Sequence, residues 1–210
     1  MNTGGLILAA GLSSRMGDFK PLMQINQKPL IALCVESMLQ AGVSRAVVVL
    51  GHRAAEVEAA LRPYAGTGRV GFACNMDYAV TDMLASVKKG LAALPPCDAF
   101  YLLPGDMPAV AQATYAALHR RMEEMEETDA TVVFPSVGGR RKHPPLIASA
   151  GIPAIIGYTG DEGLRGVWEQ LPCAMAEVAD TGCTLDADTL EDYERLKHYL
   201  EKERSGVAPA

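Results

Sequence analysis

Residues 6–22 read Leu-Ile-Leu-Ala-Ala-Gly-Leu-Ser-Ser-Arg-Met-Gly-Asp-Phe-Lys-Pro-Leu, and this stretch determines how the rest of the chain is interpreted. An apolar run over residues 5–10 stops at Gly11, after which come small residues, Arg15 and Lys20. The pattern predicts a buried strand that leads into a small-residue loop with two positive charges at its end. Backbone N–H groups in such a loop can approach a polyphosphate, and the two cations add electrostatic attraction. The segment therefore predicts a binding site for a nucleoside triphosphate.

Two widespread phosphate-binding motifs do not fit this loop. A dinucleotide-binding fingerprint needs Gly-x-Gly-x-x-Gly directly after the strand, whereas the glycines here stand at positions 4, 5, 11 and 17. A Walker A loop ends in Gly-Lys-Ser/Thr, whereas Lys20 lies between Phe19 and Pro21. The loop instead has the pattern Ala-Ala-Gly-x-Ser-x-Arg-Met-Gly-x-x-Lys-x-Leu over residues 9–22.

Composition narrows the class of protein. The chain of 210 residues suits one large or two small domains, and 49% of its residues are hydrophobic, enough for a substantial core. The net charge of −6, without a basic cluster that includes aromatics, argues against nucleic acid as a partner. The five cysteines are far apart and form no Cys-x-x-Cys pair, so we expect buried thiols in a reducing compartment, the cytoplasm. The apolar run over residues 5–10 is too short for a signal sequence or a membrane span.

Strand and helix patterns alternate along the first two thirds of the chain. Continuous apolar runs predict strands buried on both faces, at residues 5–10, 46–50, 70–74, 99–103 and 130–134. Amphipathic spacing predicts helices between them, the second ended by Pro63 and the third capped by Asp82, at residues 29–40, 54–61, 82–94 and 112–125. This rhythm predicts an α/β fold with three αβα layers around a mostly parallel, twisted sheet.

The rhythm changes after residue 135. The remaining elements are predicted as a basic turn, a short helix, a strand and an amphipathic helix, at residues 138–145, 160–168, 174–178 and 189–200. We expect one domain over residues 1–203, in which residues 1–110 hold the nucleotide and residues 111–203 hold the acceptor. Residues 204–210 are expected to form a flexible tail.

A second informative segment is Pro104-Gly105-Asp106-Met107-Pro108, which follows the apolar run at residues 99–103. Ligands of open α/β sheets bind at the carboxyl ends of the strands, where this segment and the loop after residue 10 would both lie. A carboxylate there can hold Mg²⁺, which prefers one or two carboxylates together with phosphate oxygens and water. Manganese would fit the same ligands. The alternative is that Asp106 caps the next helix or its turn, but beside a phosphate-type loop the metal role is favoured.

A firm metal site needs a second carboxylate, and Asp186-Ala187-Asp188-Thr189-Leu190-Glu191 supplies the candidates. We favour Asp188 slightly over Asp186 as the metal ligand. Asp188 could equally be the N-cap of the last helix, with Glu191 completing a capping box, while Asp186 takes the metal.

Taken together, these segments resemble the MobA/MocA-like nucleotidyltransferases, which attach a nucleotide to the molybdenum cofactor. The first loop, the Gly105-Asp106 loop, the His143-Pro144 turn, the turn at residues 160–165 and the terminal Asp-rich segment occur in family order. The resemblance implies a Rossmann-like, GT-A-like nucleotidyltransferase fold and a Mg²⁺-dependent transfer of a nucleoside monophosphate to a phosphorylated acceptor, with release of pyrophosphate. Ala9-Ala10-Gly11 is similar to the branch that uses CTP, since Ala-Gly-Gly is more typical of the branch that uses GTP.

The resemblance also implies roles for individual residues. Lys20, Arg15 and Asp106 are expected to be catalytic, with the metal held by Asp106 and by Asp188 or Asp186. The nucleotide is expected to contact residues of the two loops and of the helix after the third strand, namely Leu8, Ala9, Ala10, Gly11, Ser13, Ser14, Arg15, Lys20, Asn75, Ser86 and Asp106. The implied acceptor is molybdopterin, and a molybdoenzyme or its chaperone is a further candidate partner. We expect neither nucleic acid nor a membrane as a partner.

The chain departs from the family pattern at two places. Thr81-Asp82-Met83-Leu84-Ala85-Ser86 stands where the family often has Gly-Met-x-x-Ser, and Lys142 precedes His143 where glycine is common. Two other functions therefore stay open. One is a sister transferase with an acceptor such as phospholactate or a sugar phosphate, and the other is a nucleotide-binding regulatory module without turnover. The complete set of Arg15, Lys20 and Asp106 weighs against the module.

Two residues of the second half have open roles. His143 has no second His or Cys nearby at metal-ligand spacing, so we expect it to contact the acceptor or to form a hydrogen bond within its loop. Arg165 either reaches an acceptor phosphate or pairs with Asp161.

Overall fold

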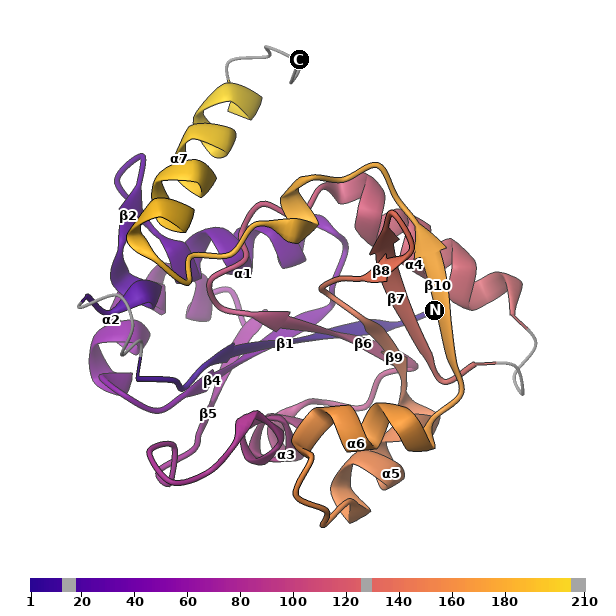
Figure 1. Cartoon of the computed structure of the whole chain (residues 1–210). Helices are drawn as coiled ribbons and strands as arrows, with labels where there is room; N and C mark the ends of the chain where they lie inside the picture. Colours follow the sequence, from indigo (N-terminus) through magenta and orange to yellow (C-terminus); the bar gives the residue numbers. More distant parts are fainter. Residues whose placement is uncertain (13–17, 126–129, 205–210) are drawn as a thin grey trace.

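The first predicted strand is β1 (Thr3–Ala9), which lies inside the main sheet (Figure 1). The computed structural model of the chain describes residues 1–12, 18–125 and 130–204. Within these ranges the main sheet has eight strands, seven of them in the order β10 (Cys173–Glu177), β7 (Val132–Val137), β9 (Leu146–Ala148), β6 (Ala99–Pro104), β1, β4 (Arg45–Leu50) and β5 (Val70–Cys74). The eighth, β8 (Arg140–Arg141), pairs with β7, and β2 (Gln24–Ile25) and β3 (Lys28–Pro29) form a separate hairpin.

Most neighbouring strands are parallel, as predicted. β1 pairs in parallel with β4 and β6, β4 with β5, and β10 with β7. Among the described strands of this sheet, β8 and β9 are antiparallel to their neighbours, and β9 joins β6 to β7. Because β1 and β6 run in the same direction, the loops that follow them leave the sheet at the same edge.

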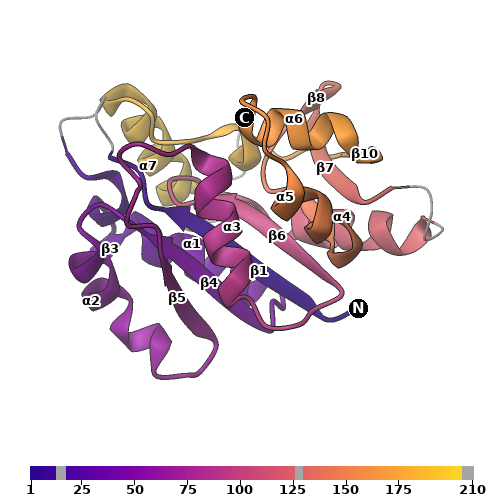
Figure 2. The same ribbon diagram turned by 90° about the horizontal axis from the view of Figure 1, so that it is seen from below.

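Helices cover both faces of the sheet, which confirms the predicted αβα layers (Figures 1 and 2). One face carries α1 (Leu30–Gln40), α2 (Ala54–Ala65) and α4 (Gln112–Glu124), and the other carries α3 (Met83–Ala93), α5 (Ile152–Gly157) and α6 (Gly163–Gln170). Successive residues of β1 alternate between the faces, so that Leu6 packs with α3 whereas Ile7 packs with α1. Both faces of the strand are buried, which explains its continuous apolar sequence.

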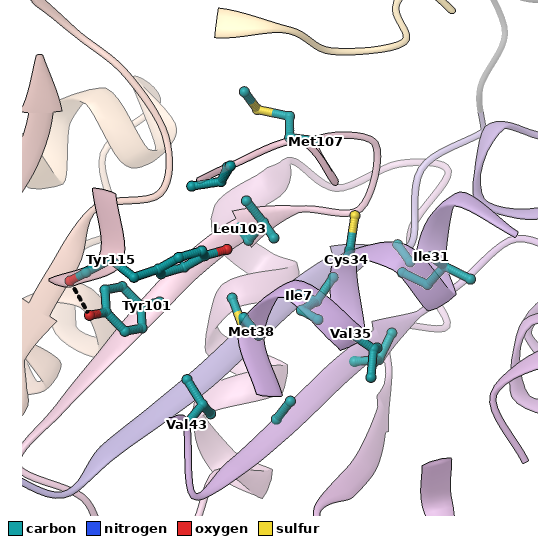
Figure 3. Close-up of a cluster of buried hydrophobic side chains, with 14 of the residues drawn as sticks. Ile7, Ile31, Cys34, Val35, Met38, Val43, Tyr101, Leu103, Met107 and Tyr115 are labelled. Carbon is teal, nitrogen blue, oxygen red and sulfur yellow. Dashed lines mark hydrogen bonds between the residues drawn. The ribbon is translucent and has the colours of Figure 1, made fainter. Parts of the chain in front are cut away.

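The apolar cluster on the α1 side anchors the strands that carry the site (Figure 3). Ile7, Val35, Met38 and Tyr101 are buried there, and the Tyr101 hydroxyl donates a hydrogen bond of 2.9 Å to the carbonyl of Tyr115. Full burial of one such apolar side chain stabilises the fold by about 1.5–3 kcal/mol. The ends of β1 and β6 are therefore held on a well-packed base.

A smaller apolar cluster attaches the C-terminal helix α7 (Leu190–Arg204) to the segment that follows Lys20. Ile25, Leu30, Tyr193 and Leu196 are buried in it, and the Tyr193 hydroxyl donates a hydrogen bond of 2.7 Å to the carbonyl of Gln24. The end of the chain is therefore fixed beside its beginning.

Several element ends differ from prediction. α2 runs through Pro63 to Ala65, because a proline in the last turn removes only one hydrogen bond of the helix. The strand predicted at residues 130–134 begins at Val132 and continues to Val137, and α5 was not predicted.

The end of the chain was also predicted imperfectly. α7 includes Arg204, the first residue of the predicted tail, and residues 205–210 lie outside the described residues. Within the described ranges, no helix combines the length and the apolar character that crossing a membrane requires.

We expect Gly90→Ala to lower the free energy of unfolding by about 1–2 kcal/mol, because overpacking exceeds the gain in helix propensity. A Cβ atom at Gly90 would collide with Leu6 and Val49, which are both buried under α3. Urea denaturation followed by circular dichroism measures this change. Gly157→Ala is the matched control, since a Cβ atom there meets nothing within 4 Å. An unfolding midpoint of Gly90→Ala equal to that of the wild type would contradict this account of helix packing.

Candidate active site

A cleft of about 380 Å³ opens at the carboxyl ends of β1 and β6, where the sequence predicts ligand binding. It is lined by the end of β1, the short turn η1 (Lys20–Leu22), the start of α3 and the loop after β6. The predicted nucleotide residues that line it are Leu8, Ala9, Ala10, Gly11, Lys20, Ser86 and Asp106. Ser13, Ser14 and Arg15 lie outside the described residues, so the centre of the predicted phosphate loop does too.

Two glycines allow neighbouring loops to close tightly around the end of β1. A Cβ atom at Gly51 would lie 2.5 Å from the carbonyl oxygen of Ala10, and one at Gly105 would lie 2.8 Å from that of Leu8. The same carbonyl of Leu8 accepts a hydrogen bond of 2.9 Å from the Gly105 N–H. A side chain at either glycine would push the loops apart, so these glycines set the shape of this wall.

Lys20 lies between two carboxylates from distant parts of the chain. Its Nζ donates hydrogen bonds to Asp188 Oδ1 at 2.6 Å and to Asp106 Oδ2 at 3.2 Å. Burial alone would lower the pKa of Lys20, but the hydrogen bonds and charges of Asp188 and Asp106 outweigh it, so the pKa lies above its usual range. Lys20 is therefore a fixed positive charge at neutral pH.

Asp186 lies beside the group formed by Lys20, Asp106 and Asp188. Its Oδ1 accepts a hydrogen bond of 3.2 Å from the backbone N–H of Asp188. Burial raises the pKa of Asp186, and the negative charges of Asp188 and Asp106 raise it further. Both candidate carboxylates of the C-terminal segment thus lie near Asp106, and Lys20 forms ion pairs with Asp188 and Asp106. Within the described residues, no three His, Cys, Asp or Glu side chains are already arranged around a common metal position.

The alternative predictions that Asp188 caps the last helix and that Asp106 caps the helix after it in the chain were wrong. Asp192 Oδ2 accepts a hydrogen bond of 3.0 Å from the Thr189 N–H, and Thr189 Oγ1 accepts one of 3.1 Å from the Asp192 N–H, so these two residues form the capping box of α7. At the start of α4, Asp180 accepts the N–H of Ala111 at 3.0 Å. Asp188 and Asp106 contact Lys20 instead.

Asn75 is buried, and its side-chain amide makes three hydrogen bonds within the protein. The side-chain nitrogen donates to Thr81 Oγ1 at 3.1 Å and to Ser86 Oγ at 3.0 Å, while Oδ1 accepts the Asp77 N–H at 3.1 Å. These bonds hold the loop between β5 and α3 in shape. Ser86 lines the cleft, and because its oxygen accepts a bond from Asn75, its hydroxyl proton can point to a ligand.

Sequence reasoning did not predict the cleft contacts of Tyr78, Thr81, Asp82 and Met83. Asp82 is the predicted cap of α3, since its Oδ1 accepts the Ala85 N–H at 3.0 Å. Their position after β5, at the same sheet edge, was the available signal. The pattern does not tell which side chains of that loop face the cleft.

The structure also shows the surroundings of His143 and Arg165, whose roles the sequence left open. His143 lies close enough to Asp106 to feel its charge, while burial lowers the pKa of the imidazole. The His143 Nδ1 atom is buried and, among the described residues, meets no hydrogen-bond partner. Arg165 pairs with Glu169 at 3.3 Å, one helical turn away, rather than with Asp161.

Comparison with known proteins shows the family to which this chain belongs. The family model of the MobA-like NTP transferase domain matches residues 5–175. The chain belongs to this family. The match confirms the resemblance inferred from the sequence, and this MobA-like protein is a nucleotidyltransferase.

Relatives of this MobA-like chain extend over nearly its whole length. It is 28% identical over 188 residues to the molybdenum cofactor cytidylyltransferase of Escherichia coli strain K12, which covers 90% of this chain and 92% of that protein. Its structure is similar to a nucleotidyl transferase from Methanothermobacter thermautotroptrophicus, with a TM-score of 0.77, 25% identity and coverage of 96% and 99% of the two chains.

A further solved structure shows the same fold. It is the Rv0371c protein of Mycobacterium tuberculosis H37Rv, determined in complex with manganese. The TM-score is 0.72 at 23% identity, and the match covers 94% of this chain and 99% of that one.

We expect Asp188→Asn to reduce nucleotidyl transfer about 100-fold and Asp186→Asn to reduce it less than about tenfold. Asp188 supplies a charge directly to Lys20, whereas Asp186 accepts a backbone N–H that an asparagine oxygen also accepts. Steady-state pyrophosphate release gives kcat/KM for each variant, and thermal melts check folding. Equal losses in both variants, or a larger loss in Asp186→Asn, would contradict the assignment of Asp188.

Proposed function

We propose that this nucleotidyltransferase moves the CMP moiety of CTP to a phosphorylated acceptor of the molybdopterin type and releases pyrophosphate. The observation that carries the proposal is the cleft in which Lys20 meets Asp106 and Asp188 beside Ala9-Ala10-Gly11. The E. coli relative, a molybdenum cofactor cytidylyltransferase by name, supports both the nucleotide and the acceptor.

The choice of CTP also has a physical argument. The Ala10 backbone is pressed against Gly51, and Ala10 lines the cleft. A methyl group at this position takes up space that glycine would leave free, which favours a small pyrimidine over a purine at the strand end.

The chemistry follows from charge. An oxygen of the acceptor phosphate forms a bond to the α-phosphorus of CTP, and the bond from that phosphorus to the bridging oxygen of the β-phosphate breaks. A phosphate monoester is largely ionised at neutral pH, so the attacking oxygen needs little help from a general base. The difficulty is to hold several anions together, and positioning with electrostatic stabilisation therefore dominates. Lys20 supplies a positive charge for the reacting phosphates, and Arg15 is proposed to do the same.

The acidic residues fit a divalent cation. Asp106 and Asp188 direct oxygens toward one common point, the Lys20 ammonium, and a pair of carboxylates is the ligand set that Mg²⁺ and Mn²⁺ take together with phosphate oxygens. We propose that these two residues hold the ion, with Asp186 beside them. A bound ion would neutralise negative charge on the phosphates.

The organisation of the chain is part of the proposal. Residues 1–110 hold the nucleotide and residues 111–203 the acceptor, within one domain over residues 1–203 in the cytoplasm. His143, next to Asp106, is then on the acceptor side. The product, a molybdenum cofactor nucleotide, would pass to a molybdoenzyme or its chaperone.

The test is pyrophosphate release with Mg²⁺ across CTP, GTP, ATP and UTP, each with molybdopterin and with a sugar phosphate. We expect release with CTP and molybdopterin. Release with the sugar phosphate alone would instead indicate a sister transferase. No release with any combination would favour a nucleotide-binding module without turnover.

We expect Lys20→Ala to reduce the rate by about 100- to 1000-fold, the usual loss when one preorganised charge is removed. The fold should survive, because the carboxylates that lose their partner reach water. Lys28→Ala is the control, since Lys28 is an exposed lysine bonded to Glu36. Near-normal turnover of Lys20→Ala would refute the role of Lys20.

A further inference from the structure

The Lys20 ammonium lies where a cation bound by both carboxylates would have to contact them. It is 2.6 Å from Asp188 Oδ1 and 3.2 Å from Asp106 Oδ2. Two positive charges cannot both stay within about 3 Å of the same oxygens, because their mutual repulsion is large at that distance. A divalent cation that binds Asp106 Oδ2 and Asp188 Oδ1 must therefore displace the ammonium.

The displacement needs a movement of the Lys20 side chain alone, because the backbone of Lys20 is held in place. The backbone of Lys20 belongs to η1, where its carbonyl accepts the Met23 N–H at 3.0 Å. Its side chain is only 11% exposed, whereas those of Asp106 and Asp188 are 19% and 38% exposed. The carboxylates can be reached from solvent, while the ammonium is held at the end of a stem with several rotatable bonds. The Lys20 ammonium therefore competes with a metal ion for the same carboxylate oxygens.

A polyphosphate in the cleft would change the competition. Lys20 lines the cleft together with Asp106, so phosphate oxygens in it offer the ammonium a second set of anionic partners. Once the ammonium turns to the phosphates, the oxygens that it leaves become available. The same phosphates add ligands for the cation.

We propose that Lys20 keeps free divalent cations from the Asp106–Asp188 pair until a nucleoside triphosphate draws its ammonium away. Metal and nucleotide then bind cooperatively, and by linkage each strengthens the other by the same factor. This inference rests on the proposed function, because it takes a polyphosphate as the ligand of the cleft. It adds a second role to Lys20, besides stabilising the reacting phosphates.

The experiment measures Mn²⁺ binding to the full chain by electron paramagnetic resonance, with and without a CTP analogue whose α–β bridge is a methylene. In the wild type, the analogue should tighten Mn²⁺ binding by roughly tenfold or more. Lys20→Met removes the charge and keeps much of the stem. It should bind Mn²⁺ alone roughly tenfold more tightly than the wild type and show little further gain from the analogue.

Two variants serve as controls. Lys20→Arg keeps the positive charge and should keep Mn²⁺ binding weak without nucleotide, which separates charge from packing. Lys28→Met removes an exposed lysine that is bonded to Glu36, and it should behave like the wild type. Melting curves of all variants check that they are folded.

Two results would overturn the proposal. One is equal Mn²⁺ affinity of the wild type with and without the analogue, and the other is Lys20→Met binding Mn²⁺ no more tightly than the wild type. Either result leaves nucleotidyl transfer intact, because pyrophosphate release by the wild type is measured separately. Absence of Mn²⁺ binding in every condition would overturn this proposal together with the proposed metal site.

Discussion

The ammonium of Lys20 lies within hydrogen-bonding distance of two carboxylates that stand 86 and 168 positions further along the chain. The cleft depends on this interaction, because it joins the loop after β1, the loop after β6 and the segment before α7. The two carboxylates would repel each other at such short range, and the ammonium between them offsets this repulsion. A change in the charge of any one of these three groups therefore alters the electrostatic environment of the other two.

This arrangement requires that the ends of the chain be held together. The small apolar cluster around Ile25 and Tyr193 does so, since it packs α7 on the hairpin that follows Lys20. The hydrogen bond from Tyr193 to the carbonyl of Gln24 fixes the position of the helix further. The C-terminal helix, none of whose described residues lines the cleft, thus positions Asp188.

The sheet supplies the rigid base of the site. Parallel pairing of β1 with β4 and β6 brings three loops to one edge, and Gly51 and Gly105 let two of them approach the backbone of β1 closely. The network around Asn75 shapes the remaining wall without exposing Asn75 itself. The loops around the cleft are in this way held in shape by buried groups behind them.

The sequence by itself determined the elements of the first two thirds, the αβα layers and the family. Each buried parallel strand is a continuous apolar run, and the loop after β1 has a distinctive pattern. It also singled out Lys20, as the positive charge at the end of that loop, and Asp106, because a carboxylate directly after an apolar strand has no packing reason to be there. These are local features, and local patterns are read directly from a chain.

Only the tertiary structure decided how distant parts meet. The sequence left Asp186 and Asp188 as alternative metal ligands. They are the same residue type two positions apart, and the sequence does not show which side chain points toward Lys20. The antiparallel strand β9 also depends on a partner far along the chain, residues 99–101 of β6. The buried role of Asn75 depends on how α3 packs against β5, which brings Ser86 to the Asn75 amide. Contacts between remote segments arise from packing, and no short-range pattern encodes them.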